Sequence, residues 1–101
     1  MDDYVRVYRI APLPDVDPAQ FEGFVVENVL PAVDTGPTRG GQISRSSLLK
    51  DLNAERKDRY LWLVYWRGTN AGWVEGRLEG ALDKLQAMGI LLSSSVLQDL
   101  G

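Results

Sequence analysis

The sequence predicts a single α+β domain whose elements follow the order strand, helix, strand, strand, helix, strand. The chain has 101 residues, enough for one hydrophobic core. Two stretches with helical periodicity separate four stretches typical of strands. The strand predicted from Arg59 to Arg67 is apolar on both faces, so we expect it to lie centrally and to be covered twice. Its faces carry Tyr60, Trp62, Val64 and Trp66 on one side, and Leu61, Leu63 and Tyr65 on the other.

The first third of the chain predicts one strand and one helix. Tyr4 to Ile10 reads as the first strand, and the paired prolines of Ala11 to Asp15 predict a loop. Asp17 suits a helix N-cap, and Pro18 suits the first helical position. Apolar residues then recur at helical spacing and predict a core-facing stripe. The stripe consists of Phe21, Phe24, Val25, Val29 and Ala32.

The middle of the chain predicts a polar strand between two loops. Asp34 to Gly41 is punctuated by glycine and proline and predicts a loop. Gln42 to Leu49 follows as the second strand, and its serines indicate an edge or partly open position. The charged stretch from Lys50 to Arg59 predicts a solvated hairpin loop before the central strand.

The last third predicts a helix and a final strand. Thr69 or Asn70 suits the N-cap of this helix, and Gly89 suits its C-cap. Ile90 to Leu100 is predicted as the fourth strand, apolar at first and then rich in serine. The predicted buried stripe of the helix consists of Val74, Leu78, Ala81, Leu82, Leu85 and Met88.

This order is that of a ferredoxin-like fold, a four-stranded antiparallel sheet with two helices on one face. In such a fold the first and third strands are central, which agrees with the doubly apolar third strand. Two helices cover one face only, so the other apolar face needs a partner. A second copy of the chain related by two-fold symmetry is the simplest partner. We therefore expect a homodimer that closes a dimeric α/β barrel.

The third strand ends in Val64-Tyr65-Trp66 and leads through a short turn into the second helix. With the element order, this resembles the dimeric α+β barrel superfamily, which includes antibiotic-biosynthesis-type monooxygenases, haem-degrading monooxygenases and stress-responsive barrel proteins. The resemblance spans essentially the whole chain. It implies that Trp66 faces a pocket between sheet and helices. The haem-degrading enzymes also use a histidine on the second helix and an asparagine on the first strand, and this sequence has neither.

Composition excludes several classes of function. The chain has no cysteine and no histidine, so it has neither a thiolate nucleophile nor the commonest metal ligand and neutral-pH base. We expect no metal site and no cofactor. The formal net charge of -3 gives no electrostatic case for nucleic acid or an anionic membrane. Met1 to Asp3 is acidic and does not resemble a secretory signal, so a cytoplasmic protein is expected.

Three aromatic residues of the central strand are candidate ligand-binding residues. Tyr60, Trp62 and Trp66 share one face, which the resemblance assigns to the helix side. As core residues they would simply dominate packing. As site residues they would form a flat wall for an aromatic or polycyclic ligand, with the indole N–H groups as hydrogen-bond donors.

Polar residues on predicted core faces are the other candidates. A buried Arg6 needs a partner, either a carboxylate or an anionic group of a ligand, because guanidinium does not deprotonate in proteins. Tyr8 lies on the same face of the first strand and is a possible proton donor. Asn28 falls on the predicted stripe of the first helix, either as a satisfied structural amide or as an orienting contact for a ligand.

Two functions follow from these patterns. The first is a small-molecule-binding or oligomerisation protein of the dimeric α+β barrel type. The second is a cofactor-independent monooxygenase-like enzyme that acts on an aromatic or polycyclic substrate. The lack of histidine and cysteine favours the first. Fold alone does not separate the two, because function resides in the site.

Overall fold

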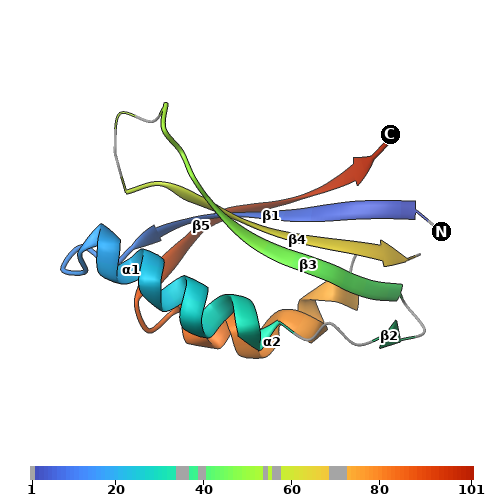
Figure 1. The fold of residues 1–101 in the computed structure, drawn as a ribbon, viewed down its shortest axis with the longest axis horizontal. Helices are drawn as coiled ribbons and strands as arrows, with labels where there is room; N and C mark the ends of the chain where they lie inside the picture. The colour runs from blue at the N-terminus through green and yellow to red at the C-terminus, as the bar shows by residue number, and fades with distance from the viewer. Residues whose placement is uncertain (1, 34–36, 39–40, 54, 56–57, 69–72) are drawn as a thin grey trace.

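The computed structural model describes residues 2–33, 37–38, 41–53, 55, 58–68 and 73–101. It forms two layers, with the helices packed on one face of a twisted antiparallel sheet (Figure 1). The strands are β1 (Asp2–Pro12), β2 (Pro37–Thr38), β3 (Gly41–Lys50), β4 (Tyr60–Gly68) and β5 (Gly89–Asp99). The helical elements are α1 (Pro18–Phe24), the π-helical turn η1 (Val25–Val29), the 3-10 turn η2 (Leu30–Ala32) and α2 (Trp73–Leu85).

The sheet confirms the predicted ferredoxin-like topology. Its strand order is β2-β3-β4-β1-β5, and every pair is antiparallel. The two-residue β2 is an addition to the four predicted strands. β4 and β1 are central, as the doubly apolar third strand predicted. The even-numbered residues of β4, from Tyr60 to Gly68, are buried. The residues between them are half-buried or exposed, so the two faces of the strand are not equally covered.

The prediction that the prolines after Ile10 end β1 is wrong. Ala11 and Pro12 continue the strand and pair with the first residues of β5. Pairing of β1 with β4 stops at Ile10, so beyond this point β1 has β5 as its only neighbouring strand. Proline has no backbone N–H to donate, and it is tolerated where one edge of a strand is unpaired. The strand therefore tolerates proline because only one of its neighbours extends this far.

The first helical segment begins as predicted and then widens. The Asp17 carboxylate accepts a hydrogen bond from the Ala19 N–H, which confirms the N-cap. The π-helical geometry of η1 keeps Phe21, Val25 and Val29, spaced by four residues, on the sheet. Asn28 was predicted on the buried stripe, and this is wrong. The side chain is exposed because the wider turn rotates it away from the sheet, and its amide donates to the Phe24 carbonyl at 3.2 Å.

The second helix packs as predicted, whereas the glycine after it has another role. Val74, Leu78 and Leu85 are buried in the core. Gly89 was predicted to be a C-cap, but it is the first residue of β5. A side chain there would run into the Phe21 ring and lie 3.0 Å from the Ala11 carbonyl oxygen. The predicted N-caps Thr69 and Asn70 lie outside the described residues.

Candidate functional site

The structure brings together five of the six predicted ligand-binding residues. Arg6 and Tyr8 on β1 and Tyr60, Trp62 and Trp66 on β4 lie on the sheet face that meets the helices. The β1–β4 register places Tyr8 opposite Trp62. The exposed Asn28 is not part of this group. We call the five residues together with Tyr4 the helix-side cluster.

Two stacked ring pairs form the body of the helix-side cluster. The rings of Tyr4 and Trp66 stack with centroids 5.4 Å apart, and those of Tyr8 and Trp62 stack at 4.8 Å. The Trp62 indole N–H donates to the Ser46 hydroxyl at 2.7 Å. Such pairs stabilise a core by about 0.5–1.5 kcal/mol beyond the area they bury. Each tryptophan ring on β4 is thus held by its cross-strand neighbour on β1.

Arg6 lies between the two stacked pairs. Its cross-strand partner is Val64, and its guanidinium carbon is 5.6 Å from the centroid of the Tyr8 ring. One terminal nitrogen forms an ion pair with Glu75 of α2. Of the two partners expected for Arg6, a carboxylate and an anionic group of a ligand, the structure supplies the carboxylate. Glu75 remains about half exposed, whereas the Arg6 side chain is 13% exposed.

Four polar atoms of the helix-side cluster are buried without a hydrogen-bond partner among the described residues. They are Arg6 Nε, the Tyr8 hydroxyl, the Tyr60 hydroxyl and Trp66 Nε1. A buried polar group left unpaired costs about 1–3 kcal/mol. Each of these atoms carries a hydrogen to donate, so each requires an acceptor. The cluster is therefore a set of neighbouring donors in an aromatic environment.

Burial changes the acidity of two tyrosines in the cluster, Tyr8 and Tyr60. It raises the pKa of Tyr8, an effect that the nearby Arg6 guanidinium partly offsets. Burial, followed by the charge of Glu22 on α1, raises the pKa of Tyr60 to about 12. Both phenols are therefore neutral near pH 7 and act as hydrogen-bond donors. Neither serves as a general base there.

The structure has hollows on the opposite face of the sheet, which we call the open face. This face carries Val5, Val7, Leu61, Leu63, Tyr65 and Leu97. A hollow of about 320 Å³ lies at the end of the face where β1 begins, bordered by Asp3, Tyr65, Trp66, Leu97 and Asp99 among others. A second of about 170 Å³ lies at the other end and borders Arg9, Arg59, Tyr60 and Leu92. Trp66 and Tyr60 therefore border space, whereas Arg6, Tyr8 and Trp62 border neither hollow.

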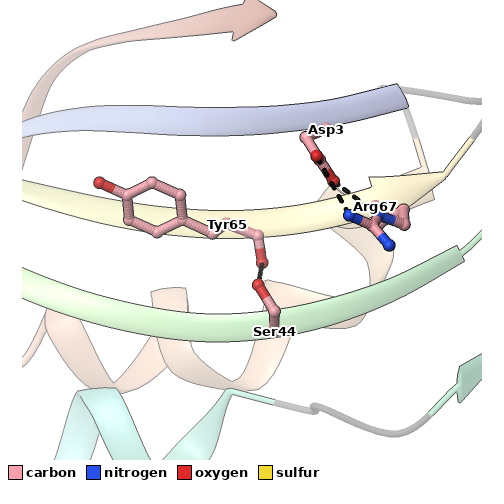
Figure 2. A network of polar contacts seen from close by, with 4 residues as sticks. All are labelled: Asp3, Ser44, Tyr65 and Arg67. Atoms are coloured by element: carbon pink, nitrogen blue, oxygen red, sulfur yellow. Dashed lines mark hydrogen bonds and ion pairs between the residues drawn. The ribbon is translucent and has the colours of Figure 1, made fainter. Parts of the chain in front are cut away.

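Polar contacts fix the strands beside the larger hollow (Figure 2). Arg67 Nε donates to the Asp3 carboxylate at 2.7 Å, across the β1–β4 pair. The Ser44 hydroxyl donates to the Tyr65 carbonyl at 3.2 Å, at the point where β3 is bulged. Arg67 holds the pKa of the Asp3 carboxyl below its usual value. This rim is charged and exposed, unlike the helix-side cluster.

Three contributors to the helix-side cluster were not predicted from the sequence. Tyr4 covers the Trp66 ring, Ser46 accepts from Trp62, and Glu75 neutralises Arg6. Tyr4 shares its face with Arg6 and Tyr8 by simple alternation, so this signal was present in the sequence. The other two depend on strand register and helix placement, which only the structure supplies.

Two negative results apply to the part of the chain that the structure describes. No three of its carboxylates lie close enough together to hold a metal ion. None of its helices combines the length and the apolar character required to cross a membrane.

The sheet order and the helices on one face define the class of this protein as a ferredoxin-like α+β chain. The solved structures that share this fold include SnoaB, a cofactor-independent oxygenase from Streptomyces nogalater. It superposes with a TM-score of 0.67 at 17% identity, over 100% of this chain and 96% of that chain. A mutant of SnoaB gives the same TM-score and coverage at 16% identity. No protein-family model and no curated protein matches the sequence.

Proposed function

We propose that this chain forms a homodimer through the open face and binds a small aromatic molecule at the helix-side cluster. The observation that carries the ligand proposal is the set of buried donors without acceptors, which includes those of Arg6, Tyr8 and Trp66. A ligand rich in carbonyl, phenolate or carboxylate oxygens supplies the acceptors that Arg6, Tyr8 and Trp66 lack. Its ring system would contact the indole and phenol rings that already stack there.

Access to the cluster is supported at Tyr4. This residue is only half-buried, whereas the Trp66 ring beneath it is fully buried. Rotation of the Tyr4 ring would free one face of the Trp66 indole without opening the rest of the core. A flat ligand would then replace one stacked ring by another at little cost in contact area.

The dimer proposal is supported by apolar side chains that the single chain leaves uncovered. Leu49, Leu92 and Leu97 are 45%, 44% and 52% exposed. They flank the half-buried Leu61, Leu63 and Tyr65, which makes a continuous apolar face. Large exposed patches of this kind mark interaction sites. A two-fold partner covers such a face with an identical one.

Binding is tested by quenching of tryptophan fluorescence with hydroxylated aromatic ketones of two, three and four fused rings. Trp66→Phe keeps an aromatic ring but removes the donor, and we expect at least tenfold weaker binding. The matched control is Tyr65→Phe, which removes a hydroxyl from the other face of β4 and should leave binding unchanged. Equal affinity of Trp66→Phe and the unmodified protein would contradict the proposed site.

A second candidate function is cofactor-independent oxygenation, favoured by the shared fold with SnoaB. The bound substrate would itself supply the electrons: an activated CH₂ group and O₂ would give a ketone and water. Arg6, Tyr8 and Trp66 would stabilise the enolate that reacts with oxygen. Oxygen consumption by ligands found in the binding screen tests this function. Binding without consumption supports the binding protein alone.

A further inference from the structure

One end of the open face carries a carboxylate without an ion-pair partner among the described residues. Asp3 and Asp99 are direct cross-strand neighbours on β1 and β5, an arrangement that is unfavourable for like charges. Arg67 compensates Asp3. Asp99 accepts a hydrogen bond from the Gly101 N–H, but it has no ion-pair partner among the described residues. Both carboxylates border the hollow of about 320 Å³.

The other end of the open face carries an uncompensated positive charge. Arg9 is exposed, and no carboxylate in the described part of the chain pairs with it. It follows Asp3 by six residues on the same face of β1, which corresponds to about 20 Å along the strand. Val5, Val7 and Leu97 lie between the two charged ends. Arg9 therefore cannot reach Asp99 of its own chain.

Two-fold symmetry can bring these charges together twice. Consider a two-fold axis that lies in the plane of the interface, runs perpendicular to the strands and passes over the apolar centre of the open face. This axis places each end of one protomer's open face against the opposite end of its partner's open face. In such an interface residue i contacts residue j, and residue j contacts residue i. Arg9 and Asp99 lie on opposite sides of this centre. The same symmetry therefore brings Arg9 of each protomer close to Asp99 of the other, which gives two identical pairs.

We propose that Arg9 of each protomer enters the hollow beside the partner's Asp99 and thereby sets the antiparallel orientation of the two sheets. This inference rests on the proposed dimer and deepens it. The hollow combines the two carboxylates with the Leu97 side chain and the Tyr65 ring, a lining that suits both the charge and the aliphatic stem of arginine. The parallel orientation is disfavoured because it brings the aspartate-bearing ends of both chains together.

Reversing the two charges separately and together tests the orientation. The dimer dissociation constant is measured by analytical ultracentrifugation for Arg9→Asp, Asp99→Arg and the double variant. We expect each single variant to weaken the dimer at least tenfold, because it places like charges in contact. The double variant restores opposite charges and should return the dissociation constant to within about threefold of the starting value.

Matched controls reverse exposed charges on the far side of α2. Lys84→Asp and Glu79→Arg change net charge as Arg9→Asp and Asp99→Arg do, and both should leave dimerisation unchanged. Circular dichroism confirms that each variant folds. If the unmodified protein is a monomer, the proposed dimer itself is wrong. If it is a dimer that the single reversals do not weaken, or that the double variant does not restore, the orientation is wrong.

Discussion

Both faces of the sheet are apolar, yet their side chains differ in size, in how firmly they are packed and in polarity. The helix side carries stacked tryptophan and tyrosine rings that are fully or largely buried, with an arginine between them. The open face carries mainly aliphatic side chains, several of them half exposed, with free charges at its ends. The contrast is visible within the single strand β4, which places Trp62 on the helix side and Leu63 on the open face.

The comparison separates two kinds of apolar surface. Rings held by cross-strand stacking and hydrogen bonds, as for Trp62 with Tyr8 and Ser46, specify one arrangement of the core. Half-exposed leucines contribute little to the single chain but gain free energy when a partner covers them. We therefore expect variants on the helix side to change stability and variants on the open face to change association.

The largest expected effect is that of Trp62→Ala. This change removes a fully buried ring together with its stack and its hydrogen bond, and it should lower the free energy of unfolding by about 3–5 kcal/mol. Leu63→Ala on the opposite face of the same strand should cost much less in the monomer. Urea denaturation at a protein concentration below the dimer dissociation constant measures both. Similar costs for the two variants would remove the distinction between the faces.

Gly89→Ala should have the next largest effect, a loss of about 1–3 kcal/mol. An added methyl group meets the Phe21 ring and the Ala11 backbone, where β5 begins against α1. Gly76→Ala is the matched control, because nothing lies within 4 Å of its added methyl group. It should stabilise α2 by up to about 1 kcal/mol. Thermal unfolding of the two variants should therefore shift in opposite directions.

Alkaline pH should weaken the helix side through Tyr60. Its pKa of about 12 in the folded protein lies above the usual value of 10, so the folded chain holds a proton that the unfolded chain loses. Stability from this group is fully present below pH 10 and is lost as the pH rises to about 12. Tyr60→Phe should flatten this decline in urea denaturation between the two pH values. Parallel declines for the variant and the unmodified protein would contradict the buried phenol.

The smallest expected effect is that of Asp3→Asn on the open rim. The ion pair with Arg67 is exposed, so salt screens it and its contribution is small. Because Arg67 lowers the pKa of Asp3, the stabilisation is present above the usual carboxyl pKa and is lost as the pH falls through the lowered value. Unfolding curves of variant and parent should differ slightly at neutral pH in low salt and coincide in strong acid. A difference that persists in acid would assign Asp3 another role.

The sequence predicted the fold well because its signals are local. Alternation in β4 and the Asp17 cap each depend on neighbouring residues, and both are confirmed. Asn28 was misplaced because a constant 100° per residue was assumed, whereas η1 is a π-helical turn. The extent of β1 was missed because pairing at Pro12 depends on where β4 stops, which is a property of the sheet.

The candidate site was predictable in its residue types but not in its contacts. The shared face of Arg6 and Tyr8 follows from alternation, and a carboxylate was one of the two partners expected for Arg6 on grounds of charge. Its identity as Glu75 depends on how α2 lies over the sheet. The ligand role of all six predicted residues stays a prediction.

The bulge at Ser44 decides which residues of β3 meet each layer. Before it, the odd-numbered Ile43 points to the helices; after it, the even-numbered Ser46 does so, while Arg45 lies over Tyr65 on the other face. If Ser44 instead took a regular place in the ladder, strict alternation would turn the Arg45 guanidinium toward the aromatic core and the Ser46 hydroxyl away from Trp62. The bulge at Ser44 thus lets β3 turn Ile43 and Ser46 toward the helices while Arg45 stays on the open face. Deleting Ser44 would remove the bulge and leave a regular strand in which Ile43, Arg45 and Ser46 keep their faces.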